Sequence, residues 1–88
     1  MKKALLLEKN DNVAVVLDDV KEDELIMIKG LDEQVRVTSL NNIELAHKIA
    51  IKKIPKGQPI LKYGEVIGLA VTDIEVGSHV HIHNICSR

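Results

Sequence analysis

The chain has 88 residues, which suffice for one domain, residues 1–88, with one small core and are too few for a second. Its 12 Lys and Arg residues nearly balance its 13 Asp and Glu residues, and the net charge of -1 argues against a nucleic-acid partner. The single cysteine, Cys86, cannot form an internal disulfide, and no apolar run is long enough for a signal peptide or a membrane span, so we expect a cytoplasmic protein with no membrane partner.

Short runs rich in Val, Ile and Leu recur along the chain, and turn-forming Asn, Asp, Gly or Pro residues separate many of them. Apolar residues make up 45 % of the chain, but Tyr63 is its only aromatic residue, so the core must be packed mainly from aliphatic side chains. The β-branched ones among them favour strands. We therefore predict an all-β fold, with strands at 3–9, 12–19, 24–30, 34–40, 47–54, 58–64, 65–71 and 79–85.

One segment, "NNIELAHK" at 41–48, has helical character. Asn42 is a suitable N-cap, and Glu44 and Leu45 follow it in the first turn. The segment is too short for a structural helix, so we predict a single helical turn here as a minor exception to the all-β fold.

A weak internal repeat runs through three nine-residue segments that begin at Val20, Ile54 and Ile74. Each segment has a β-branched residue first, Asp or Gly fourth, and Ile or Val seventh. Gly57 and Gly77, in the fourth position, adopt a positive φ without a Cβ clash, and the apolar residue three places on re-enters the core. The repeat predicts turn-then-strand units that build a folded-over β structure.

Three of the four histidines alternate along the last predicted strand, in "HVHIHN" at 79–84. On an extended strand, His79, His81 and His83 face one side while Val80 and Ile82 face the core. Histidines two residues apart lie about 7 Å apart at the backbone, close enough to chelate one ion, whereas the outer pair is separated by about 13 Å. We therefore predict His79 and His81 as metal ligands that need further donors.

Candidates for those further donors are His47, Glu65, Asp73 and, with little weight because of its opposite parity, Cys86. The alternative is that the histidines form only the solvated side of a strand, and spacing alone does not decide between the two.

A second group of candidate residues lies in "HK" at 47–48 and "KYG" at 62–64. Lysine, tyrosine and histidine side chains together bind a carboxylate and support proton transfer beside it. Taken singly, Lys48 and Lys62 have the simpler interpretation of surface charges, Tyr63 that of a residue at the rim of the core, and Gly64 that of a turn residue.

"DNVAVVL" at 11–17 and the long stretch 47–84 resemble the small amino-terminal domain of the altronate and galactarate dehydratase family. In that family the unit is called a SAF domain and has a compact β-clip fold. It occurs fused to a large catalytic region or as a separate small subunit. The small subunit of sulfolactate sulfo-lyase is similar.

The resemblance implies a component of a hydro-lyase that removes water from an aldonate or aldarate such as altronate or galactarate and gives a 2-keto-3-deoxy acid. It also implies a divalent metal, iron(II) or manganese(II), and a separate large catalytic subunit as partner. In a sulfolactate sulfo-lyase the leaving group is sulfite instead. Both reactions begin with loss of the proton α to a carboxylate, and the enediolate that results needs a metal or fixed cations beside it.

Matching positions carry the family's site residues onto this sequence. The resemblance implies catalytic roles for His47 and Lys48, metal binding by His79 and His81, and substrate binding by Lys62, Tyr63, Gly64, His83 and Asn84. The chain departs from the family at Ala46, where glycine is usual, and lacks the proline expected shortly before it.

We therefore interpret the chain as a small subunit that supplies one wall of an active site and is inactive alone. The alternative is a non-catalytic module that binds a sugar acid or holds an oligomer together, with 79–84 as an interface strand. Exposed strand edges also allow a homo-oligomer.

Overall fold

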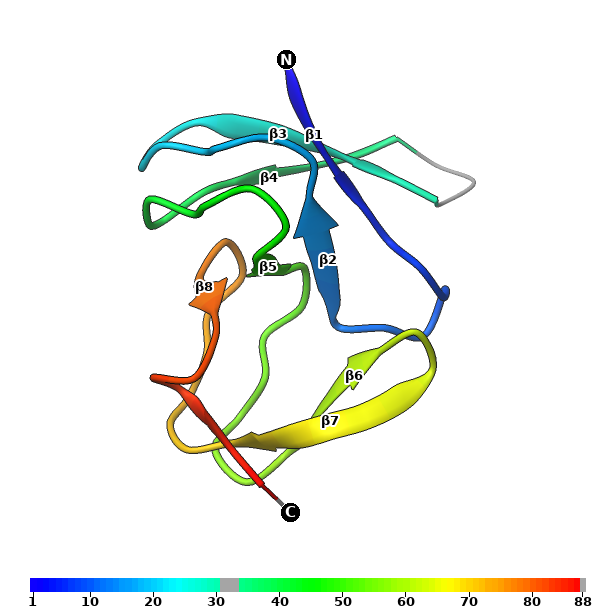
Figure 1. The fold of residues 1–88 in the computed structure, drawn as a ribbon, viewed down its shortest axis with the longest axis vertical. Coiled ribbons are helices and arrows are strands. Elements are labelled where there is room, and N and C mark those ends of the chain that lie inside the picture. The colour runs from blue at the N-terminus through cyan, green and yellow to red at the C-terminus, as the bar shows by residue number, and fades with distance from the viewer. Residues whose placement is uncertain (31–33, 88) are drawn as a thin grey trace.

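Two small β-sheets make up the fold in the computed structural model, which describes residues 1–30 and 34–87 (Figure 1). The first sheet has six strands, and its spatial order is β4-β3-β1-β2-β5-β8. The second has three strands in the order β6-β7-β9. The strands are β1 (Lys2–Leu5), β2 (Val13–Val16), β3 (Leu25–Lys29), β4 (Val35–Thr38), β5 (Lys48–Ala50), β6 (Pro59–Lys62), β7 (Glu65–Ala70), β8 (His79–Val80) and β9 (Ile85–Cys86).

Antiparallel pairing dominates both sheets, and only β1 and β3 run parallel. Within the described residues no helix is present, so the predicted all-β class is confirmed. It follows that none of those residues forms a helix able to cross a bilayer. The strands β5 and β8 form one end of the larger sheet and lie at the middle of the molecule, between the other strands of that sheet and the hairpin of β6 and β7 (Figure 1).

The predicted repeat is confirmed, and the structure adds a fourth copy that begins at Ile43. The first residues of the four copies pair through isolated antiparallel bridges, Val20 with Ile43 and Ile54 with Ile74. All four side chains are buried. Each bridge residue is followed, two residues later, by a turn and then by a strand.

The same backbone conformation recurs in all four turns. The fourth residue of each copy has a positive φ, at 70° in Asp23, 73° in Ala46, 86° in Gly57 and 94° in Gly77. Its amide donates to a carbonyl of a different strand or strand end, as Gly77 N does to Ala50 O at 2.8 Å. Ala46 occupies this position without being glycine, which explains why the sequence pattern did not reveal the fourth copy.

The predicted helical turn at 41–48 is wrong. Residues 44–47 form a β-turn, in which the His47 amide donates to Glu44 O at 2.9 Å. The Asn42 side chain does not cap this segment but accepts a hydrogen bond from Glu22 N at 2.9 Å. The physical reason is that Ile43 exchanges both of its backbone hydrogen bonds with Val20, so its carbonyl and amide are not free for a helix.

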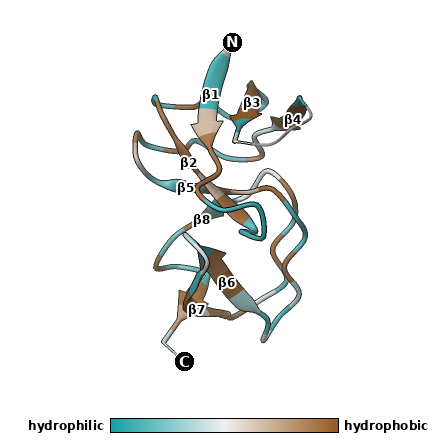
Figure 2. Cartoon of the chain, turned by 90° about the vertical axis from the view of Figure 1, so that its right-hand side faces the viewer, coloured by the Kyte–Doolittle hydropathy of each residue, from teal (hydrophilic) through white to brown (hydrophobic). Residues whose placement is uncertain are grey.

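The core consists of two clusters of aliphatic side chains, one under the larger sheet and one between β5 and the hairpin of β6 and β7. Strands β2 and β5 contribute to both clusters, because successive residues of a strand point to opposite sides. Figure 2 shows apolar residues on strands of both halves. The central ladder of β2 and β5 therefore joins the two halves and carries β8 on its edge.

Alanine substitutions at two turn glycines should distinguish the cost of a positive φ from the cost of a steric clash between the new Cβ and a neighbouring backbone atom. Both Gly57→Ala and Gly77→Ala place a Cβ at positive φ, which costs roughly 1 kcal/mol. At Gly57 the new Cβ meets nothing within 4 Å, whereas at Gly77 it lies against Thr38 O, well inside van der Waals contact. We expect Gly77→Ala to lower the free energy of unfolding by at least about 2 kcal/mol more than Gly57→Ala, measured by urea denaturation. Equal losses would contradict the close approach.

Candidate functional site

The predicted histidine strand ends after two residues. Val80 is buried as expected, but the chain then turns at 81–84, and Ile82 is 81 % exposed instead of entering the core. The side chain of Asn84 holds this turn, because its Oδ1 accepts from His81 N at 2.9 Å and its Nδ2 donates to His79 O at 2.8 Å. These bonds replace the ladder of a continuous strand, and β9 pairs with the other sheet.

The turn brings three imidazoles together. Nδ1 of His47 and Nε2 of His79 lie 3.0 Å apart. One ring nitrogen from each of His47, His79 and His81 lies within 4.8 Å of the others. The rings stack, with centroids of His47 and His81 4.2 Å apart, and the His83 ring lies 5.1 Å from that of His79. We call His47, His79 and His81 the histidine cluster.

The electrostatics favour the neutral form of two rings in the histidine cluster, His79 and His81. Burial, and then the charges of His83 and its other neighbours, lower the pKa of His79 from 6.5 to about 4. Burial also lowers the pKa of His81, and His47 adds to this effect. Neutral imidazole is the form that binds metal, and converging imidazole nitrogens suit iron, zinc, copper or nickel. The residues of the histidine cluster therefore fit a divalent transition-metal ion.

The other predicted metal donors do not join the cluster. Among the residues that the structure describes, the histidine cluster is the only group of three such donors, and Glu65, Asp73 and Cys86 are outside it. The Asp73 carboxylate instead accepts a hydrogen bond from Lys56 N at 2.8 Å. Of the predicted further donors, the structure places His47, from the turn before β5, beside His79 and His81.

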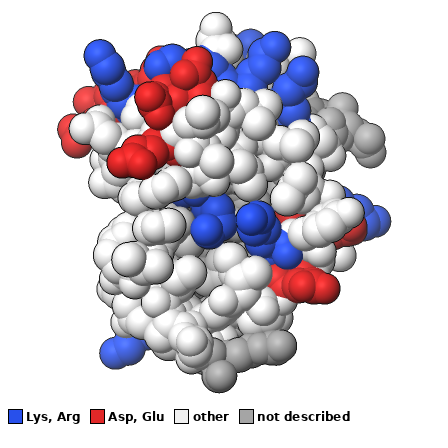
Figure 3. Space-filling model, viewed as in Figure 1, with Lys and Arg blue, Asp and Glu red and all other residues white. Residues whose placement is uncertain are grey.

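The two candidate lysines, Lys48 and Lys62, are close enough for their positive charges to repel each other. Burial lowers the pKa of Lys48, and the neighbouring charge of Lys62 lowers it further. In the ladder, Lys48 pairs with Val80, and Ile49 with His79, so Lys48 leaves β5 on the face opposite to His79. Its charge nonetheless contributes to the lowered pKa of His79. Figure 3 shows Lys or Arg side chains grouped at the middle of the molecular face that Figure 1 views.

Among the "KYG" residues, Lys62 ends β6, and Tyr63 and Gly64 form the turn of the hairpin between β6 and β7. Tyr63 and Gly64 have positive φ values of 55° and 75°. The Tyr63 ring is 73 % exposed, and no hydrogen bond or ring stacking joins it to the histidine cluster within the described part of the chain. Substrate binding by Lys62, Tyr63, Gly64, His83 and Asn84 stays a prediction, and the structure adds that the Asn84 side chain also holds the 81–84 turn.

Sequence reasoning missed the residue that anchors this hairpin turn. The side chain of Asp11 is fully buried, and its carboxylate accepts hydrogen bonds from three backbone amides. The donors are Tyr63 N at 2.7 Å, Gly64 N at 2.9 Å and Glu8 N at 3.1 Å. The signal was available, since Asp11 opens the 11–17 motif that supported the family resemblance, although the motif does not indicate the partner.

Asn12 fastens the same hairpin from the next position. Its Nδ2 donates to Pro59 O at 2.9 Å, and its Oδ1 accepts from Leu61 N at 2.8 Å. Asp11 and Asn12 together bind β6 and its following turn to the start of β2. The placement of Lys62 therefore depends on these two side chains.

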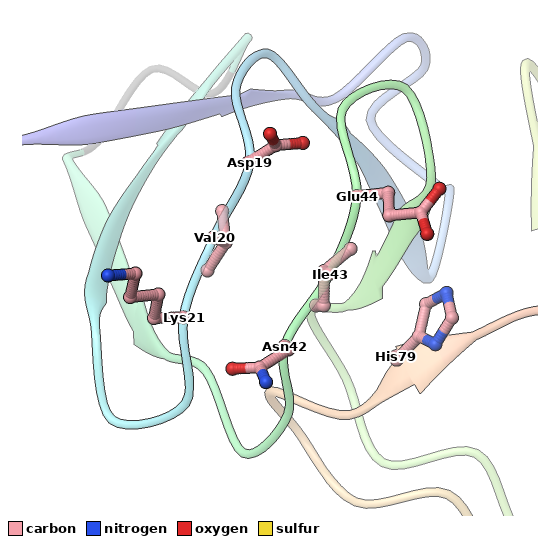
Figure 4. A pocket seen from close by; sticks show the side chains of 7 residues that line it. All are labelled: Asp19, Val20, Lys21, Asn42, Ile43, Glu44 and His79. Carbon is pink, nitrogen blue, oxygen red and sulfur yellow. The ribbon is translucent and has the colours of Figure 1, made fainter.

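An open groove of about 650 Å³ adjoins the histidine cluster (Figure 4). Its floor is the bridge between Val20 and Ile43, and its rim is polar. The residues that line it are Asp19, Val20, Lys21, Asn42, Ile43, Glu44 and His79. His79 belongs both to the groove and to the histidine cluster, so the two features form one continuous surface.

The SAF domain of the altronate/galactarate dehydratases is the family whose sequence profile matches residues 2–88. The chain belongs to this family, which confirms the resemblance read from 11–17 and 47–84.

Individual relatives are of two kinds. Over 84 residues the chain is 37 % identical to altronate dehydratase of Bacillus subtilis (strain 168), a match that covers 96 % of this chain and 16 % of that enzyme. It is 43 % identical over 74 residues to altronate dehydratase of Escherichia coli (strain K12), which covers 84 % of this chain and 14 % of the relative. It is 40 % identical over 60 residues to (2R)-sulfolactate sulfo-lyase subunit alpha of Paracoccus pantotrophus, 68 % of this chain and 90 % of that subunit. The chain thus spans only a small part of the altronate dehydratases that it matches.

Removing the Asp11 carboxylate should be far more costly than removing an exposed one. Asp11→Ala leaves three backbone amides without acceptors in a buried place, and each such loss costs about 1–3 kcal/mol. We expect a loss of at least about 3 kcal/mol in the free energy of unfolding. The matched control Asp73→Ala removes an exposed carboxylate that accepts a hydrogen bond from Lys56 N, and it should cost about 1 kcal/mol or less. Similar urea midpoints for the two variants would contradict the buried anchor.

The stability of the metal-free chain should fall as the pH decreases. Because the pKa of His79 is about 4 in the fold and 6.5 is its ordinary value, the unfolded chain binds more protons between these two values. Stability therefore rises with pH across this window and is lost on acidification. The ring is partly exposed, so we expect His79 to account for roughly 1 kcal/mol of the loss.

The measurement is urea unfolding between about pH 7 and pH 5 for the wild-type chain and for His79→Gln. The variant should show a shallower loss, because the contribution of the carboxylates is the same in both chains. Superimposable pH profiles would contradict the assigned pKa.

Proposed function

We propose that this chain is the SAF component of a lyase that removes water from a sugar acid of the aldonate or aldarate class and gives a 2-keto-3-deoxy acid. The observation that carries the proposal is the histidine cluster, in which three ring nitrogens lie within 4.8 Å of one another on the surface of a domain from a dehydratase family. Metal-assisted elimination next to a carboxylate needs such a donor set.

In this proposal His47, His79 and His81 hold a divalent metal ion. The resemblance implied a catalytic role for His47, which was also a candidate for the further metal donor, and here we assign it as a metal ligand. Three imidazoles suit iron(II) better than manganese(II), which prefers carboxylate ligands. The ion, when bound, supplies Lewis-acid stabilisation to the oxygens of the substrate.

The lysines supply the remaining charge. Lys62 supplies a cation that attracts the carboxylate of the acid, and burial together with the charge of Lys62 lowers the pKa of Lys48. A lysine with a lowered pKa is deprotonated in a larger fraction of molecules at neutral pH and is then available as a base. Lys48 leaves β5 on the face opposite to His79, but its charge acts on that ring, so Lys48 is our candidate for the acceptor of the proton α to the carboxylate. His83, whose ring lies beside His79, contacts the substrate at the rim.

A larger catalytic partner completes the site. The groove beside the histidine cluster is open, whereas elimination requires a cavity that excludes water. The altronate dehydratases that the chain matches are far longer than the matched region, which covers 16 % and 14 % of them. We propose that a polypeptide corresponding to the rest of those enzymes covers this face, and that the chain is inactive alone.

A second candidate is the small subunit of a carbon–sulfur lyase. The supporting observation is that the matched region covers 90 % of (2R)-sulfolactate sulfo-lyase subunit alpha of Paracoccus pantotrophus, so this relative is a chain of similar extent. The chemistry on the α carbon is the same, and only the leaving group differs.

Metal titration followed by assay of the complex tests both candidates. We expect the isolated chain to bind one Zn(II) or, under anaerobic conditions, one Fe(II), and each of His47→Ala, His79→Ala and His81→Ala to weaken binding by roughly 10- to 100-fold or more. With a dehydratase-type large subunit, the same variants should lose turnover of altronate or galactarate. Product is measured as the 2-keto-3-deoxy acid, and sulfite release from sulfolactate identifies the second candidate.

The matched control is His83→Ala, which removes a neighbouring imidazole that is outside the histidine cluster. It should leave metal affinity unchanged. A chain that binds no divalent ion, or a complex whose activity survives His79→Ala, would instead support a non-catalytic module that only binds a sugar acid or joins subunits.

A further inference from the structure

Charged side chains line the groove next to the histidine cluster, and none of the roles proposed above involves them. It begins at His79 and Glu44 and runs along the bridge between Val20 and Ile43 toward Asp19 (Figure 4). When one end of a ligand is held at the histidine cluster, the rest of that ligand can therefore lie in this groove. At about 650 Å³ the groove is large enough for an extended six-carbon chain.

Two carboxylates face this groove. Asp19 is held in place, because its Oδ1 accepts from Leu45 N at 2.8 Å, and its other oxygen accepts no hydrogen bond from the described residues. Figure 4 shows Asp19 and Glu44 on the two facing segments of the bridge, at the same end of the groove, with the Glu44 carboxylate directed away from Asp19. Glu44 also approaches His47, with 3.8 Å between Oε2 and Nε2. Free carboxylate oxygens are acceptors, which suit hydroxyl donors.

Among the described residues that line the groove, Lys21 is the one cation, and its side chain is directed away from Glu44 and His79 in Figure 4. Lys2 lies outside the lining: its Nζ donates to the backbone oxygen of Asp19 at 2.6 Å and pairs with the Glu24 carboxylate at 3.3 Å. The charged side chains that line the groove are therefore two acids and one outward-directed base, which favours a negative potential where a substrate tail would lie.

We propose that this groove selects the tail of the substrate: it accepts a neutral chain of hydroxyl-bearing carbons and rejects a second anionic group. The inference rests on the proposed function, and it favours a monocarboxylate polyol acid over a dicarboxylate or a sulfonate. Hydroxyl groups of such a tail donate to Asp19 and Glu44. A second carboxylate or a sulfonate in the same place meets like charge and loses hydration without gaining a donor.

Altronate and galactarate provide a matched pair of probes. Both have a six-carbon chain with hydroxyl groups on the carbons between its ends, but altronate has one carboxylate and galactarate has two. Binding is measured by NMR shifts of the Zn(II)-loaded chain at low ionic strength. We expect altronate to bind at least about fivefold more tightly, the scale of one screened charge pair near a surface. The shifts should include the amides of 19–21 and 42–45, which form the groove.

Asp19→Asn tests the cause, since the amide oxygen still accepts the Leu45 hydrogen bond while the charge is removed. This variant should reduce the preference toward unity. The control Glu22→Gln removes one negative charge from the same segment but outside the groove lining, and it should keep the preference. Both variants are compared with the wild-type chain for the same two acids.

Equal or tighter binding of galactarate, above all if Lys21→Met abolishes it, would overturn the inference while leaving the proposed function standing. An unchanged preference in Asp19→Asn would overturn it as well. If neither acid shifts any resonance of the chain, and the complex with a large subunit turns over neither, the proposed function fails and the inference fails with it.

Discussion

The fold depends on a left-handed backbone conformation that recurs in four turns. In each copy the fourth residue has a positive φ and donates a backbone hydrogen bond to a carbonyl oxygen of another segment; these residues are Asp23, Ala46, Gly57 and Gly77. These turns alternate with the two antiparallel bridges, Val20 with Ile43 and Ile54 with Ile74, and so cross-link segments far apart in the sequence. A core with no Phe or Trp has little area per side chain to bury, and such a backbone network compensates for it.

The same turns position the candidate functional side chains. His47 immediately follows the positive-φ residue of the copy at Ile43, and His79 follows that of the copy at Ile74 by two positions. Because β5 and β8 then pair, the two rings meet. The 81–84 turn, held by the Asn84 side chain, adds the third ring. The histidine cluster thus forms from the two turn-and-strand copies that begin at Ile43 and Ile74, together with the 81–84 turn.

Three polar residues are buried in the part of the chain that the structure describes: Ser39, whose hydroxyl donates to Asn41 O at 2.6 Å, and the two anchors Asp11 and Asn84. Asp11 holds the turn of the β6–β7 hairpin, and Asn84 holds the turn that carries the histidines. No buried side-chain nitrogen or oxygen among the described residues lacks a hydrogen-bond partner. Both anchors lie beside a predicted functional segment, which is consistent with a need for precise placement that aliphatic packing alone does not provide.

Local patterns in the sequence determined the all-β class, three of the four turn-and-strand copies and the family, because alternation and turn residues act over a few positions. They did not reveal the fourth copy, since Ala46 adopts a conformation in which glycine is expected, nor the break after Val80, since hydrogen bonds from one amide side chain override the alternation in "HVHIHN". The tertiary structure alone decided that His47 joins His79 and His81 and that Asp11 anchors a turn 52 residues away. Such contacts depend on strand pairing between distant segments, which no local pattern encodes.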